Sequence, residues 1–418
     1  MKIAFLVNDL QLSGGVGVVI QHARKLSLMD GWDVTLVLVR EDEAPSWRGY
    51  EHLPDLHIRS RREAKAEHYD VAVATWWETT LTLFDIPADR YAYFVQSLED
   101  RFYRYDEAGR LGAAATIDLP VSFITEARWI AETLAQLRPD APCHLVPNGI
   151  DKEIFAPAGE VTPSPAGRPL RVLVEGSPRV WFKHVRDSVR AAESMREPHH
   201  VTVVCGERDA LGEVTADEVV GPLTPRQMAD AYRRSDLVLK LSSVEGVFGP
   251  PLEGFHCGAT CVVTPVTGHD EYVVHGYNGL LTDWDDLRGT ARQLDLLARD
   301  RDLLQFLRTN ALQTAHAWPD WEHCSRVMAD ALVAIREGPQ PNVSAATVGL
   351  LTDLRSGIEI QEVFLSQRRD WRRRAQRFER PLERVGGDKV FRRALMLRSR
   401  AAHFAAASAR RLSRKTRP

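Results

Sequence analysis

Short apolar runs alternate with longer segments of helical periodicity along most of the chain. Apolar runs of this length, bounded by turn residues, are typical of buried strands. In the first part of the chain we predict strands at 3–7, 33–39, 71–75, 91–95, 121–125 and 144–147. Segments with helical spacing at 18–29 and 126–137 lie among them, and 8–17 reads as a loop. Strands that alternate with helices predict a parallel α/β sheet.

The same alternation restarts after residue 168. Strands are predicted at 170–174, 201–205, 236–241 and 261–263, and helices at 185–195, 225–235, 251–258 and over much of 280–335. Between the halves, 146–151 favours a turn, and 156–168 is rich in Pro, Gly and Ala. Two repeats joined by a hinge predict two domains with a cleft between them, where ligands usually bind. The predicted domains are 1–155 and 165–340, followed by an extension at 341–418.

Composition is that of a soluble globular protein, with 44% hydrophobic and 27% charged residues among 418. No run approaches the roughly 18 apolar residues of a membrane helix. The first apolar run ends at Asn8 and Asp9, so it reads as a strand and not as a signal peptide. Five cysteines without metal-ligand spacing fit a reducing compartment. We therefore expect a cytoplasmic protein.

Charge is uneven, because 366–418 carries 18 Lys and Arg against 4 Asp and Glu. Its net charge is +14 and that of the preceding residues is −17. Apolar residues near helical spacing predict basic helices here, which favour an anionic membrane surface. Peripheral association with the inner face of the cell membrane is the expectation. A solvated helix or a docking helix for a protein is the alternative. No nucleic-acid partner is expected, because no nucleic-acid fold motif is present.

The stretch 242–258 holds two glutamates, Glu245 and Glu253, with seven residues between them. A strand, a Gly/Pro loop and a helix start here, which is the layout of an anion or sugar site in a parallel sheet. The stretch resembles the signature of the family-4 (group 1) retaining glycosyltransferases. The resemblance implies the GT-B fold, in which two Rossmann-like domains face each other across a cleft.

By this resemblance, Glu245 lies at the sugar of a nucleoside diphosphate donor and Glu253 accepts hydrogen bonds from the ribose. A carboxylate has the acceptor geometry that a vicinal diol requires. Glycines after the first strand would approach the donor or acceptor closely, and their spacing is not the dinucleotide-binding fingerprint. A plain tight turn is the alternative there. The other donor-binding residues implied are Gly14, Gly15, Val247, Phe248, Gly249, Gly221 and Leu223.

The family grips the diphosphate with an Arg/Lys pair after the first strand of the second domain. Lys183 matches the lysine, but Ser177 stands where the arginine is expected, so we assign Arg179, two residues later. Gln96 stands where many relatives carry a histidine beside the sugar. Glutamine can hydrogen-bond to a hydroxyl but cannot act as a general base near neutral pH. By the resemblance, the predicted catalytic set has four members: Glu245, Lys183, Arg179 and Gln96.

The segment Asp283-Trp284-Asp285-Asp286 contains the Asp-x-Asp pattern that binds metal in another glycosyltransferase fold. Its position before a predicted helix near Leu287 favours a helix cap instead. We predict no metal, and no cofactor besides the donor substrate.

The resulting hypothesis is a metal-independent retaining glycosyltransferase. It moves a hexose or deoxyhexose from a nucleotide sugar to a glycan or lipid-linked acceptor, in surface polysaccharide biosynthesis. Two alternatives stay open: another GT-B enzyme, such as a nucleotide-sugar epimerase, or a catalytically silent scaffold that binds glycan or membrane. No residue spacing specifies the base, the sugar, the acceptor, the linkage or the oligomeric state.

Overall fold

The computed structural model describes residues 1–11, 13–40, 55–107, 109–163, 165, 167–339, 343–344 and 347–357. The chain divides into two compact units, Met1–Thr352 and Asp353–Pro418. The predicted basic helices of 366–418 lie outside the described residues. All of the architecture below therefore belongs to the first unit.

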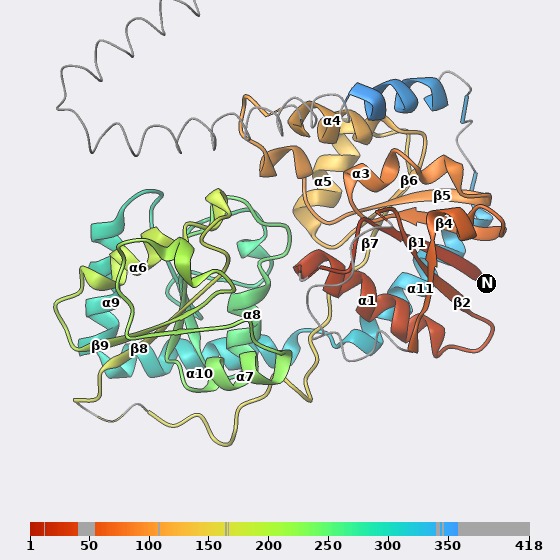
Figure 1. Cartoon of the computed structure of the whole chain (residues 1–418). Coiled ribbons are helices and arrows are strands. Elements are labelled where there is room, and N and C mark those ends of the chain that lie inside the picture. The colour runs from red at the N-terminus through yellow and green to blue at the C-terminus, as the bar shows by residue number, and fades with distance from the viewer. Residues whose placement is uncertain are drawn as a thin grey trace, which may run out of the picture. The chain divides into compact units, whose positions relative to one another are not determined.

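The first sheet has seven parallel strands in the order β3-β2-β1-β4-β5-β6-β7 (Figure 1). The strands are β1 (Lys2–Val7), β2 (Asp33–Leu38), β3 (His57–Ser60), β4 (Tyr69–Ala74), β5 (Ala88–Val95), β6 (Ser122–Thr125) and β7 (Cys143–Leu145). The helices are α1 (Gly14–Ser27), α2 (Arg61–Ala64), α3 (Trp77–Thr80), α4 (Gly109–Ala115) and α5 (Arg128–Leu137). The strand order reverses between β1 and β4, and ligands of such sheets bind beyond the carboxyl ends at that switch point.

The second sheet repeats this topology with six parallel strands in the order β10-β9-β8-β11-β12-β13. The strands are β8 (Leu170–Glu175), β9 (His199–Val204), β10 (Glu218–Val220), β11 (Leu237–Lys240), β12 (Thr260–Val263) and β13 (Leu280–Leu281). The helices are α6 (Val185–Glu193), α7 (Pro225–Arg233), α8 (Gly249–His256), α9 (Leu287–Arg299), α10 (Arg301–Ala317) and α11 (Trp321–Glu337). Its switch point lies between β8 and β11.

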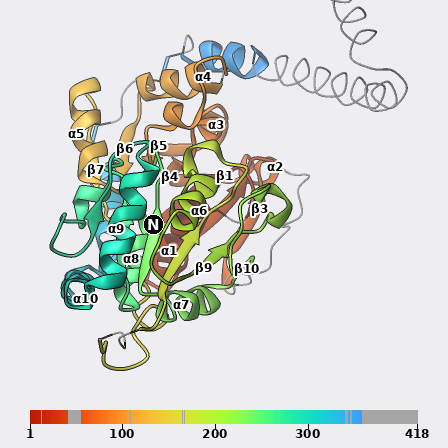
Figure 2. The same ribbon diagram turned by 90° about the vertical axis from the view of Figure 1, so that its left-hand side faces the viewer.

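Helices bury both faces of the second sheet, which explains its continuous apolar strands. Val189 of α6 and Leu294 of α9 pack in one core cluster. Figure 2 shows the two helices that carry them, α6 and α9. Tyr232 of α7 and Phe255 of α8 pack in another. The predicted α/β architecture with two Rossmann-like sheets is confirmed, whereas the exact domain boundaries stay predictions.

The first helix begins earlier than its periodicity predicts. The pattern predicts a loop as far as Gly17, but α1 starts at Gly14. Ser13 caps it, since its Oγ accepts a hydrogen bond from the Val16 N–H at 3.1 Å. An N-cap of this type outweighs the low helix propensity of the glycines that follow. Gly14 and Gly15 therefore form the first turn of a helix.

Helix α11 returns to the first sheet. Met328 and Leu332 of α11 share a buried cluster with Ile20 of α1, and Figure 1 shows α11 beside α1. His22 of α1 is buried there, with Nδ1 3.1 Å from Ser325 Oγ. Burial lowers the pKa of His22 to about 3, so this contact is uncharged at neutral pH.

Two segments join the sheets, and they contact each other closely. The Ile150 N–H donates to Pro319 O at 3.2 Å, and Trp318 Nε1 donates to Asn148 O at 2.8 Å. A Cβ atom on Gly149 would lie 2.4 Å from the Trp321 nitrogen. Gly149 is thus required by a close backbone approach, in addition to its suitability for a turn.

We predict that Gly149→Ala destabilises the protein, because overpacking of this kind costs about 1–3 kcal/mol. The melting temperature should fall by several degrees, measured by circular dichroism. Gly159→Ala is the matched control, since a Cβ atom there meets nothing within 4 Å. Equal melting of the two variants would contradict the proposed contact.

Candidate functional site

An ion pair lies beyond the carboxyl ends of the second sheet. Lys183 Nζ is 2.8 Å from Glu245 Oε1 and 2.7 Å from Glu245 Oε2. Lys183 follows β8, and Glu245 follows β11, so the two strands of the switch point deliver the two side chains. The Glu245 side chain is only 9% exposed and that of Lys183 is 25% exposed. The structure therefore brings together two of the residues predicted from the resemblance.

A second ion pair lies directly behind the first. Lys240 Nζ, at the last position of β11, is 2.7 Å from Glu175 Oε2 and 3.9 Å from Glu245 Oε1. Burial alone would lower the pKa of Lys240, but the neighbouring carboxylates raise it above its usual value. Sequence reasoning missed both Lys240 and Glu175, because a charged residue at a strand end usually points to solvent.

Glu253 lies on α8, near these charges. Its Oε2 accepts a hydrogen bond from the Tyr232 hydroxyl at 3.0 Å. Burial raises the pKa of Glu253 to about 7, with a further contribution from the negative charge of Glu175. Its carboxyl group therefore changes charge near neutral pH, which matters for any role as an acceptor of hydroxyl hydrogen bonds.

The loop after Glu245 uses part of its backbone internally. The Val247 N–H donates to Glu126 Oε1 at 3.1 Å, and the Gly249 N–H donates to Val247 O at 2.9 Å. Phe248 has its side chain buried in the core, and its carbonyl accepts a hydrogen bond from Tyr272. Of the three donor-binding residues predicted in this loop, Val247 and Gly249 thus have their backbone N–H groups bonded within the protein.

Glu126, which no sequence signal singled out, connects three segments. Besides Val247, it accepts a hydrogen bond from Asn148 Nδ2 at 2.8 Å. Asn148 belongs to the segment that joins the two sheets. Burial raises the pKa of Glu126 to about 7, and its hydrogen bonds lower it only in part. Glu126 therefore connects the loop after Glu245, which we call the signature loop, to the segment around Asn148 that joins the two sheets.

Gln96 lies against the first turn of α1 and against the loop that follows Glu245. A Cβ atom on Gly15 would lie 3.1 Å from Gln96 Oε1, and one on Gly246 would lie 1.9 Å from Gln96 O. The Gln96 side chain itself donates from Nε2 to Thr75 O at 3.2 Å. Ser97 Oγ donates to the Glu245 carbonyl at 3.3 Å. The carboxyl end of β5 thus lies against the N-terminus of α1 and against the signature loop.

The remaining predicted residues have other surroundings. Arg179 pairs with Asp209 at 2.6 Å, and both side chains are exposed, at 58% and 78%. A Cβ atom on Gly14 would meet nothing within 4 Å. Gly221 has a φ of +120° and approaches the Cys205 carbonyl, which restricts the position to glycine. Leu223 packs against the core beside α7 and α8.

Four aromatic rings connect the loop that carries Lys183 to the first sheet. Trp76 stacks on Phe102 with centroids 5.7 Å apart, and Phe102 lies 5.0 Å from Phe182. Trp181 packs on Phe182, and its Nε1 donates to Phe102 O at 3.2 Å. The adjacent Trp181-Phe182 pair before Lys183 was the sequence signal that could have indicated this contact.

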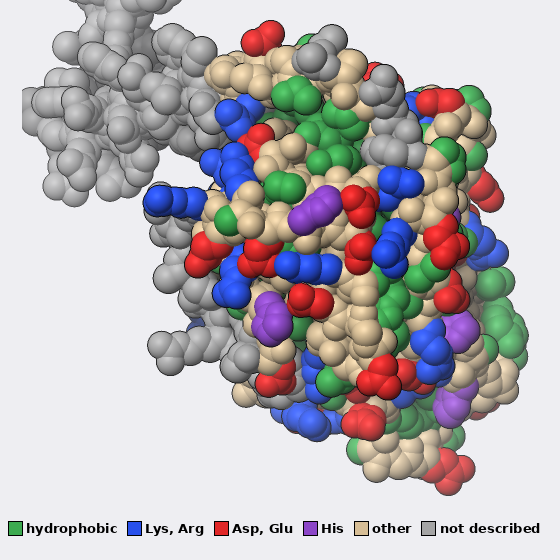
Figure 3. Space-filling model, turned by 90° about the vertical axis from the view of Figure 1, so that its right-hand side faces the viewer, with side chains coloured by type: hydrophobic (Ala, Val, Ile, Leu, Met, Phe, Trp, Pro, Cys, Tyr) green, Lys and Arg blue, Asp and Glu red, His purple; other side chains and the backbone are tan. Residues whose placement is uncertain are grey.

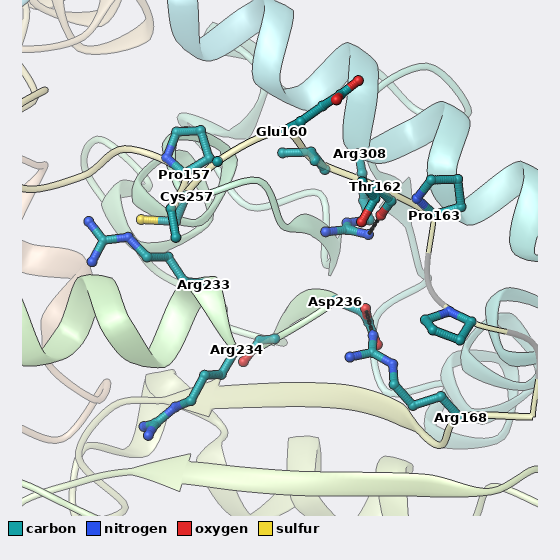
Figure 4. A pocket seen from close by; sticks show the side chains of 15 residues that line it. Pro157, Glu160, Thr162, Pro163, Arg168, Arg233, Arg234, Asp236, Cys257 and Arg308 are labelled. Atoms are coloured by element: carbon teal, nitrogen blue, oxygen red, sulfur yellow. Dashed lines mark hydrogen bonds and ion pairs between the residues drawn. The ribbon is translucent and has the colours of Figure 1, made fainter.

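A pocket of about 220 Å³ lies at the amino end of β11, beneath the segment 156–168 that links the two sheets and is called the linker below (Figure 4). Arg168 forms an ion pair with Asp236, and Arg308 Nη1 donates to the Thr162 carbonyl at 3.2 Å. These arginines hold the linker against the second sheet. Because Glu245 follows the opposite end of the same strand, the pocket is separate from the charged group described above.

Asp286 caps α9, as predicted, since its Oδ1 accepts a hydrogen bond from the Gly289 N–H at 2.7 Å. Within the described ranges, no group of three or more His, Cys, Asp and Glu side chains could hold a metal ion. Metal independence stays a prediction. No helix of the described part of the chain has the length and apolarity needed to cross a membrane.

Sequence comparisons match only part of the chain. Residues 170–300 match the family model described as Glycosyl transferases group 1. N-acetyl-alpha-D-glucosaminyl L-malate synthase of Bacillus anthracis is 33% identical over 89 residues, which are 21% of this chain and 23% of that protein. D-inositol 3-phosphate glycosyltransferase of Rhodococcus erythropolis is 28% identical over 166 residues, 40% of this chain and 34% of that protein. The chain thus spans only about a quarter to a third of the length of these two relatives.

Solved structures match more of the chain at low identity. Sucrose-phosphate synthase from Thermosynechococcus elongatus has a TM-score of 0.64 and 17% identity, covering 79% of this chain and 98% of that one. HepE of Anabaena, in complex with UDP and glucose, has a TM-score of 0.64 and 16% identity, covering 80% and 100%. Likeness at this identity concerns the fold. Residues 170–300 are thus similar to the group 1 glycosyltransferases, and the solved structures support the GT-B fold.

Proposed function

We propose that this chain is a metal-independent retaining glycosyltransferase, which moves a hexose or deoxyhexose from a nucleoside diphosphate sugar to a glycan or lipid-linked acceptor. The observation that carries the proposal is the contact between Lys183 and Glu245 at the switch point of the second sheet. It lies within the segment that matches the group 1 family model. The structural neighbour HepE is described in complex with UDP-glucose, which supports a nucleotide-sugar donor.

Each charged residue has a role in this proposal. The Lys183 ammonium neutralises the departing diphosphate, where fixed positive charge stabilises the transition state most. Glu245 orients the donor sugar, and Glu253 accepts hydrogen bonds from the ribose hydroxyls. Gly14 and Gly15, in the first turn of α1, present a helix N-terminus that favours phosphate.

Gln96 is compatible with retention, because a same-face mechanism uses the leaving phosphate as the proton acceptor. The donor's bond between the anomeric carbon and phosphate oxygen breaks, and a bond to the acceptor oxygen forms on the same face. The acceptor's proton goes to the leaving phosphate oxygen, so no protein base is needed. Gln96 would orient a sugar hydroxyl, because its amide can donate and accept hydrogen bonds.

A silent scaffold is the competing proposal. It is favoured by the internal engagement of the Val247 N–H and by the distant, exposed position of Arg179. A scaffold that has lost its donor site would show no nucleotide binding, whereas a transferase or a nucleotide-sugar epimerase would bind one. Product analysis then separates the last two.

The membrane association that we propose rests on charge. Lys and Arg side chains are intermixed with Asp and Glu over the described residues of the face in Figure 3. The net charge of +14 in 366–418 is therefore the feature that would attract anionic lipid.

Nucleotide binding tests the proposed donor site. Wild-type protein should melt several degrees higher with one of UDP, ADP or GDP, because a ligand at 100 times its dissociation constant adds about 2.7 kcal/mol. Glu253→Ala and Lys183→Ala should lose the shift. Glu132→Ala, an exposed change on α5, is the control and should keep it. A wild-type protein that none of the three nucleotides stabilises would favour the scaffold.

The roles of the two cations can be separated. Because Arg179 is exposed and paired with Asp209, Arg179→Ala should weaken nucleotide binding less than Lys183→Ala. Isothermal titration calorimetry with the same nucleotide measures both. Equal losses would show that Arg179 moves to the diphosphate on binding.

For the tail, deletion of 366–418 should weaken binding to vesicles that contain phosphatidylserine. The loss should shrink at high salt, since exposed charges are screened. Vesicle co-sedimentation of the full chain and the truncated chain measures it. Equal binding by both would exclude the tail as the membrane contact.

A further inference from the structure

Lys240 is a buried cation to which the proposed reaction assigns no role. Its side chain is only 1% exposed, whereas lysine is almost never fully buried unless it is paired. Nζ donates to the Glu175 carbonyl at 3.2 Å and to Glu175 Oε2 at 2.7 Å. A buried pair of this kind seldom adds net stability, since desolvation offsets the attraction. Its position therefore calls for another explanation.

That position is the switch point of the second sheet. Lys240 ends β11 and Glu175 ends β8, the two strands between which the strand order reverses. A Cβ atom on Gly176, the first residue of the loop that carries Lys183, would lie 3.8 Å from Lys240 Nζ. The ammonium thus lies directly beneath the loop that would hold the diphosphate.

Glu245 has two cations in this structure. Lys183 Nζ lies 2.7 Å from Glu245 Oε2, and Lys240 Nζ lies 3.9 Å from Glu245 Oε1. On the proposed function, Lys183 turns to the donor's diphosphate. Glu245 would then lose the nearby positive charge of Lys183 while a negatively charged diphosphate is bound close by. Like charges that are close together and shielded from water repel each other strongly. Lys240 cannot withdraw, because its stem is held in the core.

We infer that Lys240 is a positioning residue of the donor site, the fixed counter-charge for the carboxylates of Glu245 and Glu253 when Lys183 engages the diphosphate. This inference rests on the proposed function. A pre-positioned charge needs no rearrangement when the donor binds, which is the most effective form of electrostatic support.

The protonation of Glu253 can be used to measure the effect of Lys240. Five titratable groups interact with Glu253: Glu175 of β8, Lys240 of β11, Tyr232 of α7, Cys257 after α8, and Tyr272 after the short helix His269–Glu271. Burial raises the pKa of both tyrosines, and it raises that of Cys257 to about 12. The tyrosines and the cysteine stay neutral between pH 6 and 9. Lys240 lowers the pKa of Glu253, and Glu175 raises it.

Affinity for UDP-glucose should therefore depend on pH. Burial holds the pKa of Glu253 near 7, so its carboxylate forms, and accepts the ribose hydroxyls, as pH rises through that value. UDP-glucose is the probe because it lacks the terminal phosphate that titrates near pH 6. Calorimetry from pH 6 to 9 should show tighter binding at high pH, and Glu253→Gln should remove the dependence.

The two partners of the buried pair should shift this dependence in opposite directions. Lys240→Met removes the positive charge, so the midpoint should move up by about one pH unit and affinity at pH 7 should fall roughly tenfold. Glu175→Gln removes the negative charge, so the midpoint should move down. A purely structural role would weaken binding in both variants without opposite shifts, which would overturn the inference.

If Lys240→Met does not fold, the double variant Lys240→Met/Glu175→Gln replaces it in the test, since the double variant leaves no buried unpaired charge. The folded double variant should bind UDP-glucose roughly tenfold more weakly than the wild type at pH 8. Wild-type affinity in the double variant would overturn the role of Lys240 and leave the donor site intact. Wild-type protein that binds none of UDP-glucose, ADP-glucose and GDP-mannose would overturn the donor site, and the role of Lys240 with it.

Discussion

The structure depends on one electrostatic constraint: charges that gather where the second sheet ends must neutralise one another. Lys183, Lys240, Glu175 and Glu245 form two ion pairs that touch, with each buried charge next to one of opposite sign. Removal of Glu175 takes away the closest carboxylate of Lys240, the most deeply buried of the four charges, and loss of one partner of a buried pair is far more costly than loss of the whole pair. The two strand ends are therefore fixed by their charges as much as by their backbone hydrogen bonds.

A steric constraint brings the first sheet to these charges. A Cβ atom on Gly246 would overlap the Gln96 carbonyl at 1.9 Å, and one on Gly268 would overlap the Gly246 carbonyl at 2.1 Å. Three backbone segments thus pass one another where only glycine fits. Glu245 precedes Gly246, so the same contact that excludes side chains delivers its carboxylate next to the end of β5.

The fold could be predicted from the sequence because parallel strands buried on both faces read as apolar runs. The site could be predicted only in part. Arg179 is the arginine nearest to the expected position, but a short 3-10 helix, Trp181–Lys183, turns the chain after it. Arg179 therefore points to Asp209 and Lys183 points to Glu245. A backbone turn of this kind has no signature in residue spacing.

Lys240 and Glu126 were missed for a different reason. Each lies in a segment whose local pattern has a sufficient ordinary explanation, as the polar end of a strand or as the start of a helix. Their partners, Glu175 and Val247, are 65 and 121 residues away along the chain. Local patterns predict secondary structure well, but a charge that is buried only by tertiary contacts cannot be recognised from its neighbours in sequence.

The loop after β8 unites the two constraints. It carries Lys183 towards Glu245, and its aromatic residues Trp181 and Phe182 contact Phe102 of the first sheet. The Phe182 carbonyl also accepts a hydrogen bond from the Ser243 N–H at 2.8 Å, two residues before Glu245. The segment that holds the cation therefore contacts both the segment that carries Glu245 and the aromatic residues beside the first sheet.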